Sequence, residues 1–283
     1  MTDDASKAAA LETLQNFVAA LSNNPPLESE AQFYVLPSSF ALLSHPAANE
    51  FRQTRLAQMV SNTSAKITSI LAAGATSVEE VIIPPGPDIW VHADLAAIWA
   101  GYSVRIDGVE RARGVNAVSL LNVPGEGWKI SGVADTQWAP DAPPPPADND
   151  EEENQAMIAP IYAFLAHLKA REWDGMLSLV LLGGGATHSR PPAAPMFSTF
   201  PELIERVKGI TEAAPPGTVL EEPIFDVQTR RVGELGFAWT PFVTTANGVL
   251  RSKGINVFTL LKRDGKWVIT GIQDTATYVE EHS

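Results

Sequence analysis

Polar and ionisable residues at matched positions of two similar segments are the strongest candidates for chemistry in this sequence. The segments are GVNAVSLLNVPGEGWKISGVADT and GINVFTLLKRDGKWVITGIQDTA, which carry Asn116 and Asp135, and Asn256 and Asp274. A buried amide could donate a hydrogen bond to a substrate oxygen or orient a water. A carboxylate in an apolar cavity has a raised pKa and suits acid–base work. The alternative roles are structural, with the amides bonding nearby loops and the aspartates bonding backbone at strand ends.

His188 and Arg190 form a second group, in the stretch THSRPP that follows three consecutive glycines. Histidine is the usual base near neutral pH, and loops that cover pockets often deliver catalytic groups. The surrounding residues are rich in Gly, Ser and Pro, so the sequence predicts a loop here. A histidine at the protein surface without a catalytic role is the alternative.

Tyr102 could donate a hydrogen bond to an oxyanion, whereas the second half has Phe242 at the matched position. Packing between the two halves is an equally open role for this phenol. A mostly apolar set of side chains is expected to contact the substrate. The set is Trp99, Trp239, Tyr102, Phe258 and Gln273.

Composition excludes several classes of function. The chain has 283 residues, no cysteine, a formal net charge of −13 and a pI of about 4.8. Without cysteine there are no disulfides or thiolate metal sites, and the negative charge disfavours nucleic acid and anionic membranes as partners. No phosphate-binding loop, dinucleotide fingerprint or HExxH motif is present, so neither a cofactor nor a metal is expected. No secretory signal or membrane-length apolar run occurs, so a cytoplasmic location is predicted.

A proline-rich, acidic stretch divides the chain. Residues 139–155, APDAPPPPADNDEEENQ, predict a linker because consecutive prolines favour extended geometry and the acidic run after them stays solvated. It separates residues 1–138 from residues 156–283. The two halves align at a nearly constant offset, with matching glycines and tryptophans, which indicates a duplicated domain.

Both halves are predicted to have the same order of elements. Apolar residues at helical spacing indicate a first helix near 11–21 and again near 158–168. A loop rich in Gly, Ser and Pro follows, and then a second helix near 50–72 and 200–210. The last ~50 residues of each half are predicted to form three antiparallel strands joined by tight turns.

The turns set the predicted register of these strands. Asp107-Gly108 is a two-residue hairpin signal, and counting outward from it places Trp99 opposite Asn116. The second half repeats this pattern around its own Asn-Gly turn. Strict alternation then gives one bulky face, which the helices cover, and one face of small residues that another sheet could approach.

The same alternation predicts where the polar groups point. It places Gln273 beside Asn256 on the bulky face, and Asp135 and Asp274 on the opposite face. Only a β-bulge, which is common in bent sheets, would turn the two aspartates toward the helices. The small-residue faces of the two halves are expected to pack together, so that a monomer contains an internal pseudo-dimer.

Helices followed by a bent antiparallel sheet ending in W-x-I-x-x-x-x-D-T resemble the NTF2-like superfamily, a cystatin-like α+β cone, and more closely its SnoaL-like branch. The resemblance rests on LAAIWAGYSVRIDG, LGFAWTPFVTTANG, the GVN and GIN starts, and GWKISGVADT with KWVITGIQDT, while THSRPP resembles a pocket-covering loop. It implies an α+β fold of two domains, each with N-terminal helices packed on a bent sheet around an apolar cavity. Enzymes of this superfamily act there without metals or nucleotides.

Together these features predict a cofactor-independent enzyme that acts by acid–base chemistry on a hydrophobic, oxygenated metabolite. The reaction would be epoxide opening, cyclisation or isomerisation in natural-product biosynthesis. A non-catalytic ligand-binding or interaction module with the same fold is the alternative. A third hypothesis assigns catalysis to one repeat and a scaffolding role to the other.

Overall fold

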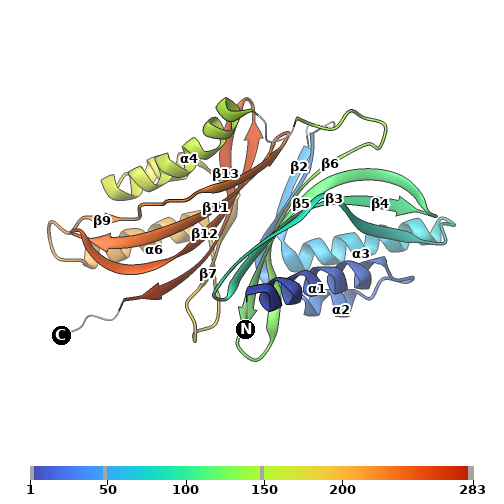
Figure 1. The fold of residues 1–283 in the computed structure, drawn as a ribbon, viewed down its shortest axis with the longest axis horizontal. Helices are drawn as coiled ribbons and strands as arrows, with labels where there is room; N and C mark the ends of the chain where they lie inside the picture. The colour runs from blue at the N-terminus through green and yellow to red at the C-terminus, as the bar shows by residue number, and fades with distance from the viewer. Residues whose placement is uncertain (1–2, 47–49, 147–149, 280–283) are drawn as a thin grey trace. The chain divides into compact units, whose positions relative to one another are not determined.

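Two units, Met1–Pro146 and Ala147–Ser283, make up the chain in the computed structural model (Figure 1). The structure describes residues 3–46, 50–146 and 150–279. Each unit is α+β, with N-terminal helices and a sheet of its own, which confirms the predicted fold class. The packing of the two sheets into an internal pseudo-dimer stays a prediction.

Unit 1 (Met1–Pro146) has a six-stranded sheet in the order β2-β1-β6-β5-β4-β3. Only β1 and β6 run parallel, and the other neighbours are antiparallel. One face of the sheet packs against apolar helix residues such as Leu14, Phe17 and Val60 to form the core. The elements are α1 (Asp3–Ser22), α2 (Glu28–Phe33), β1 (Val35–His45), β2 (Glu50–Arg55), α3 (Leu56–Ala72), β3 (Val78–His92), β4 (Leu95–Ile106), β5 (Val109–Val123) and β6 (Gly127–Trp138).

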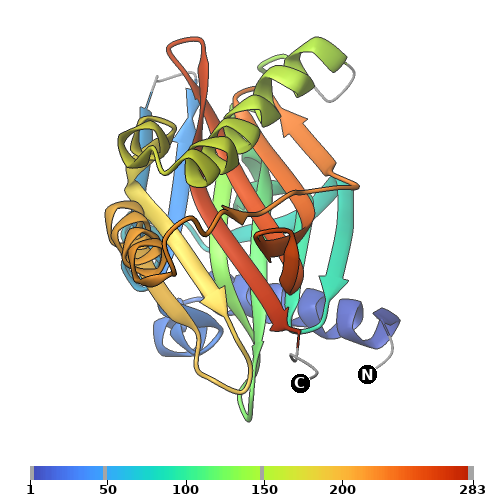
Figure 2. The same ribbon diagram turned by 90° about the vertical axis from the view of Figure 1, so that its left-hand side faces the viewer.

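Unit 2 (Ala147–Ser283) repeats this plan, with strands in the order β10-β11-β12-β13-β7-β8 and the short β9 paired with β11. Figure 2 shows α4 and α6 lying over one face of its sheet. Met157, Phe164, Phe200 and Ile204 of the helices pack there against the strands. The elements are α4 (Glu151–Ala170), α5 (Trp173–Ser178), β7 (Val180–Ser189), β8 (Met196–Thr199), α6 (Phe200–Ala213), β9 (Leu220–Glu221), β10 (Gln228–Val232), β11 (Leu235–Ala246), β12 (Val249–Arg263) and β13 (Lys266–Tyr278).

Most of the two segments predicted as Gly/Ser/Pro-rich loops is strand, in β1 of unit 1 and β7 of unit 2. Residues 190–195 form a loop as predicted, and residues 47–48 of the first segment lie outside the described residues. Each of the two strands pairs in parallel with the last strand of its unit, and this long-range pairing outweighs the weak strand propensity of Gly and Ser. The predicted second helix also begins later than expected, at Leu56, because residues 50–55 form β2. His188 is therefore carried by a strand and not by a covering loop.

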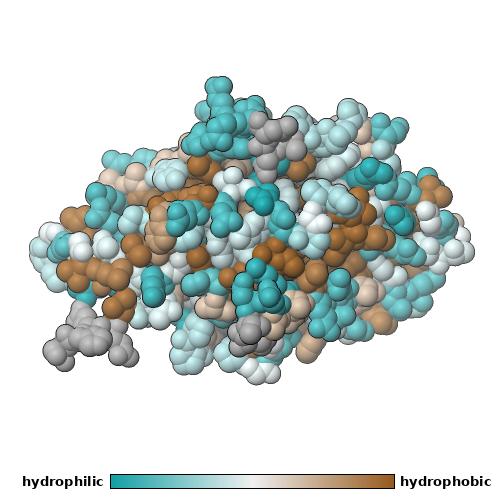
Figure 3. Space-filling model, in the orientation of Figure 1, coloured by the Kyte–Doolittle hydropathy of each residue, from teal (hydrophilic) through white to brown (hydrophobic). Residues whose placement is uncertain are grey.

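Residues 151–155, the end of the acidic run predicted as solvated linker, begin α4, whereas residues 147–149 of that run lie outside the described residues. Asp150 caps this helix by accepting a hydrogen bond from the backbone N–H of Glu153 at 3.1 Å. The helix dipole favours acidic side chains at this end of α4. The same end of the helix is hydrophilic in Figure 3. Glu153 also accepts hydrogen bonds from Trp267 Nε1 at 2.6 Å and from Lys262 Nζ at 2.8 Å, so the run is anchored to the sheet.

The predicted hairpin turn at Asp107-Gly108 is confirmed, with φ of 52° and 74° at the two residues. The predicted register beyond it is wrong by one residue. A bulge shifts the pairing between Val104 and Arg105, so Asn116 lies opposite Ala100, and Trp99 lies opposite Ala117. A bulge consumes an extra residue on one strand, and every side chain beyond it changes face.

Unit 2 has the same correction. The pairing of β11 with β12 shifts between Thr244 and Thr245, so Asn256 lies opposite Thr240, and Trp239 lies opposite Val257. The bulkier side chains of this strand, including Trp239, therefore lie on the face away from the helices. The helix-covered core contains Ala238 and Phe258 in their place. The predicted assignment of the bulky face to the helices is thus wrong for β4 and β11.

A second bulge turns both aspartates toward the helices. The pairing of β5 with β6 shifts between Ser119 and Leu120, which places Asp135 opposite Asn116. The pairing of β12 with β13 shifts between Thr259 and Leu260, which places Asp274 opposite Asn256. Gln273 instead pairs with Val257 and lies on the other face, so its predicted place beside Asn256 is wrong.

Candidate functional site

A row of carboxylate, amide and carboxylate crosses the helix-covered face of each sheet. In unit 1 the row is Glu80 of β3, Asn116 of β5 and Asp135 of β6, and Asn116 Nδ2 donates to Glu80 Oε1 at 3.1 Å. Ala100 of β4 lies between them as the cross-strand partner of Asn116. The two bulges and the small side chain on β4 bring three polar groups together over an otherwise apolar face.

Neutral groups hold the aspartate of unit 1. Asp135 Oδ2 accepts a hydrogen bond from the Tyr102 hydroxyl at 2.9 Å, and Oδ1 accepts one from the backbone N–H of Ser44 at 3.0 Å. Tyr102 is therefore part of the row, although the sequence left a place at the repeat interface equally open. Burial and the adjacent Asp135 carboxylate raise the pKa of Tyr102 well above its usual value, so the phenol stays a donor.

Burial also holds protons on the carboxyl groups of unit 1. It raises the pKa of Glu80 to about 7, with a further rise from the charge of Asp135 and a smaller opposing effect of the Asn116 hydrogen bond. It raises the pKa of Asp135 to about 6, against the hydrogen bonds from Ser44 and Tyr102. Near neutral pH the carboxyl groups of this row are therefore partly protonated, whereas ordinary carboxyl groups would be ionised.

An imidazole and a guanidinium hold the aspartate of unit 2. Asp274 Oδ1 lies 2.6 Å from His188 Nδ1, and Oδ2 accepts a hydrogen bond from Arg190 Nη2 at 2.5 Å. Burial acts to raise the pKa of Asp274, but the charges and hydrogen bonds of His188 and Arg190 outweigh it and the pKa lies below its usual value. Asp274 is therefore an ionised carboxylate that is 5% exposed.

The other end of the unit 2 row is a second carboxyl group. Asn256 Nδ2 donates to Glu222 Oε1 at 2.8 Å. Burial raises the pKa of Glu222 to about 7, the Asn256 hydrogen bond lowers it, and the charge of Asp274 raises it. Unit 2 thus combines an ionised aspartate with a glutamic acid that gains and loses its proton near neutral pH.

His188 has one free nitrogen. The side chain is 8% exposed, its Nδ1 faces Asp274, and its Nε2 is buried without a hydrogen-bond partner. A buried ring nitrogen without a partner costs free energy, so an unmatched atom of this kind favours a role with a ligand. Ala186, two residues earlier on the same strand, belongs to the helix-covered core, so His188 points to that side of the sheet.

The two units differ at the position of this histidine. The strand register aligns His188 with Asp274 in unit 2 and Leu43 with Asp135 in unit 1. Unit 1 therefore has an apolar side chain where unit 2 has its imidazole. Tyr102 takes over the hydrogen bond to the aspartate, and unit 2 has Phe242 at that place.

Six sequence-predicted residues come together as two groups, one in each unit. Asn116 and Asp135 meet in unit 1, and Asn256, Asp274, His188 and Arg190 meet in unit 2. Phe258 lies in the unit 2 core on the same face as Asn256. Trp99, Trp239 and Gln273, predicted to contact the substrate, lie on the opposite face of their sheets.

Sequence reasoning missed Glu80 and Glu222. A signal for them exists, because each is the second residue of a Glu-Glu pair that precedes the hairpin in its half, in VEEVII and LEEPIF. An acidic pair repeated at similar positions between apolar residues suggests that one carboxyl group of each pair points inward. In the structure that residue is Glu80 or Glu222, and each bonds the asparagine of its row.

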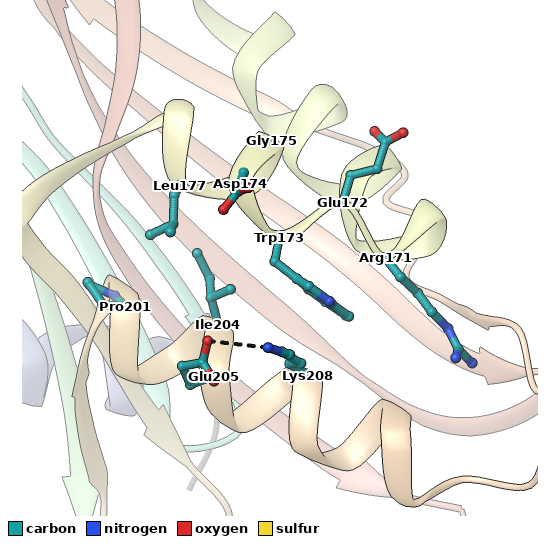
Figure 4. A pocket seen from close by; sticks show the side chains of 10 residues that line it. All are labelled: Arg171, Glu172, Trp173, Asp174, Gly175, Leu177, Pro201, Ile204, Glu205 and Lys208. Carbon is teal, nitrogen blue, oxygen red and sulfur yellow. Dashed lines mark ion pairs between the residues drawn. The ribbon is translucent and has the colours of Figure 1, made fainter.

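A separate hollow of about 530 Å³ lies between α5 and α6 (Figure 4). Trp173, Leu177 and Ile204 supply its apolar walls, and the ion pair of Glu205 with Lys208 lies at its rim. None of the residues of the unit 2 row lines it. It is therefore distinct from the site built around His188.

Two findings concern other kinds of function. Within the part of the chain that the structure describes, no three His, Asp or Glu side chains are grouped so that they could hold a metal ion. In the same residues no helix has both the length and the apolar character needed to cross a membrane.

Tyr102→Phe is expected to lower the free energy of unfolding of unit 1 by about 1–2 kcal/mol, because the buried Asp135 loses a hydrogen bond. It should also raise the pKa of Asp135 further, since that hydrogen bond favours the ionised form. NMR titration of the Asp135 carboxyl carbon and urea denaturation measure the two effects. Thr240→Ser, which keeps a hydroxyl on β11, is the control, and an unchanged Asp135 titration in the Tyr102 variant would contradict the expectation.

No protein-family model matches the sequence, and no curated protein sequence matches it. The solved structures that match include NTF2-like and cystatin-like proteins, each of which covers about half of this chain. A protein with a cystatin-like fold from Nostoc punctiforme is 9% identical, with a TM-score of 0.38, over 44% of this chain and 92% of its own. An NTF2-like protein from Pseudomonas putida is 10% identical, with a TM-score of 0.37, over 47% and 89%. A proposed NTF2-like dehydratase from Streptomyces avermitilis is 9% identical, with a TM-score of 0.37, over 45% and 97%.

Proposed function

We propose that this protein is a cofactor-independent enzyme that transfers protons on a small, hydrophobic, oxygenated molecule, and that unit 2 is the catalytic unit. One observation carries the proposal. His188 is held by Asp274 through Nδ1 at 2.6 Å, while its Nε2 is buried and has no partner. A histidine oriented by a carboxylate on one nitrogen and free on the other is poised to act as a general base.

The ionised Asp274 selects the tautomer of the histidine. An Nδ1–H that donates to the carboxylate leaves the lone pair on Nε2, which is the atom that faces a substrate. Asp274 also stabilises the imidazolium that forms when Nε2 takes a proton. Arg190 holds the second carboxylate oxygen and so keeps Asp274 in the orientation that His188 requires.

Glu222 supplies the acid. Its pKa of about 7 leaves a large share of the side chain protonated at neutral pH, and Asn256 orients it by donating to Oε1. In an isomerisation, His188 would take a proton from a carbon next to a carbonyl while Glu222 gives a proton to the oxygen, forming an enol. The imidazolium of His188 would then give its proton to another carbon, and the enol oxygen would return its proton to Glu222. Epoxide opening or cyclisation would use the same pair, with His188 activating water or an internal hydroxyl. Isomerisation needs no other reactant, and we favour it.

We also infer that the two units arose by duplication, that they belong to the SnoaL-like branch of NTF2-like proteins, and that the chain acts as a monomer in natural-product metabolism. The matched rows and the bulges at matched positions of both sheets support the duplication. The residue motifs support the branch. Leu43 in place of a histidine supports unit 1 as a scaffold or as a binding unit.

The second candidate function is non-catalytic binding of a similar molecule in one or both units. The row of unit 1 favours it, because Glu80, Asn116 and Asp135 offer hydrogen bonds without a base such as His188. A binding protein of this kind would not depend on proton transfer at His188.

The experiment incubates the protein with a panel of enolisable ketones and epoxides in D₂O and follows deuterium incorporation, double-bond migration and ring opening by NMR. For any converted compound, His188→Gln is expected to lower the rate by at least about 100-fold, because a general base is lost. His167→Gln is the matched control. His167 also places Nδ1 2.6 Å from a carboxylate, that of Glu172, but it lies at the surface.

The variants separate the two candidate functions. Loss of turnover in His188→Gln with full turnover in His167→Gln would support the enzyme. Turnover that is unchanged in His188→Gln would overturn the acid–base proposal. Compounds that bind without being converted, with affinities independent of His188, would support the binding module.

A further inference from the structure

A second guanidinium group, which the acid–base pair does not use, lies at the site of unit 2. Arg206 of α6 donates from Nη1 to Ser198 Oγ at 2.9 Å and lies 3.7 Å from Met196 Sδ. On β8, Ser198 pairs with Ala186, and Met196 pairs with His188. Cross-strand partners of an antiparallel pair project to the same face of the sheet, so the guanidinium of Arg206 lies over the face that carries His188.

Arg206 has no carboxylate within ion-pair distance among the residues that the structure describes. The carboxylate whose charge acts on it is Asp274, and both oxygens of Asp274 are already held by His188 and Arg190. The charge of Arg190 repels it. The site therefore brings two guanidinium groups to one ionised carboxylate, and a partly buried guanidinium without a carboxylate partner is costly unless a ligand supplies one.

We propose that the substrate of unit 2 carries a carboxylate group that binds to Arg206 while its reacting end lies at His188. The inference rests on the proposed acid–base function and specifies its substrate class. The planar guanidinium matches the two oxygens of a carboxylate, so this pair would fix orientation as well as contribute affinity.

Burial along the site gives the direction of binding. Arg206 and Arg190 are partly exposed, whereas His188 is buried. A ligand that reaches Nε2 of His188 therefore keeps its charged end near the two guanidinium groups and places an apolar, oxygenated end deeper. Phe258 and Ile272 of the unit 2 core lie on that face of the sheet. The substrate class is thus a hydrophobic oxo or hydroxy acid.

The matched helix of unit 1, α3, contains no arginine and carries Lys66, an ammonium group whose charge acts on Asp135. The unit with the buried histidine is also the unit with the arginine on its covering helix. A planar guanidinium can bind a carboxylate through two parallel hydrogen bonds, whereas an ammonium acts as a point charge, so the arginine of unit 2 fits a unit that binds and converts a carboxylate substrate.

The test uses isothermal titration calorimetry with two pairs of probes, benzoate with benzamide and 2-naphthoate with 2-naphthamide. Each pair has the same shape and differs in charge. The intact chain is expected to bind at least one carboxylate more tightly than its amide. Arg206→Gln should weaken that carboxylate by about 10- to 100-fold and change the amide little, because a charge-assisted pair is lost. Lys208→Gln, on the same helix and paired with Glu205 at 3.9 Å, is the control and should bind as the parent does.

Three results would overturn the inference: no carboxylate probe binds, an amide binds as tightly as its carboxylate, or Arg206→Gln leaves carboxylate affinity unchanged. Equal weakening in Lys208→Gln would also overturn it, because it would show a general effect of charge. Failure of the carboxylate inference can be distinguished from failure of the proposed acid–base function. Neutral compounds converted in a His188-dependent way would keep the acid–base enzyme and remove only the carboxylate anchor.

Discussion

Replacing Asp274 by alanine is expected to lower the free energy of unfolding of unit 2 by about 3–5 kcal/mol, the usual cost of removing one member of a buried ion pair. The side chain is 5% exposed and holds His188 at 2.6 Å and Arg190 at 2.5 Å. Its removal leaves a partly buried guanidinium and an imidazole without their common partner. Urea denaturation, with the transitions of the two units fitted separately, measures the change.

Asp135→Ala in unit 1 is the matched control, because Asp135 occupies the same place opposite an asparagine. Its partners are the neutral Tyr102 hydroxyl and the Ser44 amide, and burial already raises its pKa to about 6. The expected loss is therefore smaller, about 1–2 kcal/mol. Equal losses in the two variants would show that His188 and Arg190, as partners of Asp274, add nothing to stability beyond what neutral partners add.

Replacing both Glu80 and Glu222 by glutamine is expected to remove much of the decline in stability between pH 5 and pH 8. Each carboxyl group has a pKa of about 7 in the folded protein against an ordinary value of 4.5. The folded state therefore binds more protons than the unfolded state in this window. Stability from these groups is fully present below pH 4.5 and is lost as the pH rises through about 7.

The size of the effect follows from the same pKa values. The pKa difference between the folded and unfolded states corresponds to a loss of at most about 3 kcal/mol of unfolding free energy per carboxyl group at pH 8. Both side chains are partly exposed, which reduces this loss to about 2 kcal/mol. Glutamine keeps the oxygen that accepts from Asn116 or Asn256 but cannot ionise. The double variant should match the parent at pH 5 and exceed it at pH 8.

Urea denaturation at several pH values checks this expectation, with the exposed neighbour Glu79→Gln as the control. The control should follow the parent at every pH, because Glu79 lies outside the row. A parent protein whose stability does not fall between pH 5 and pH 8 would contradict the burial of titrating carboxyl groups. A double variant whose unfolding free energy falls with pH as steeply as that of the parent would also contradict it.

Local chemistry in the sequence determined the element types and the turns. The Asp107-Gly108 turn, the amphipathic first helices and the three closing strands of each half depend on neighbouring residues, so they could be predicted from periodicity and turn propensity. The matched Asn and Asp positions also stand out in the sequence alone. They stand out because the chain carries the same pattern in both halves.

Only the tertiary structure decided which side chains meet. A single extra residue on one strand turned Asn116 away from Trp99, and another turned Asp135 and Asp274 toward the helices. These bulges lie between consecutive strands, but their positions depend on how the strands pack in the whole sheet, and no residue signal in the sequence marks them. The same holds for β1 and β7, whose Gly- and Ser-containing segments become strands only through parallel pairing with the last strand.

The sequence by itself therefore determined an α+β chain in two halves with matching residue patterns, with Asn116, Asn256, Asp135, Asp274, His188 and Arg190 as candidate residues. The tertiary structure added Glu80 and Glu222, removed Trp99, Trp239 and Gln273 from the site face, and joined His188 to Asp274. The reason is physical. Residue type sets what a side chain is able to do, whereas burial, register and the identity of the nearest charge set its direction and its pKa.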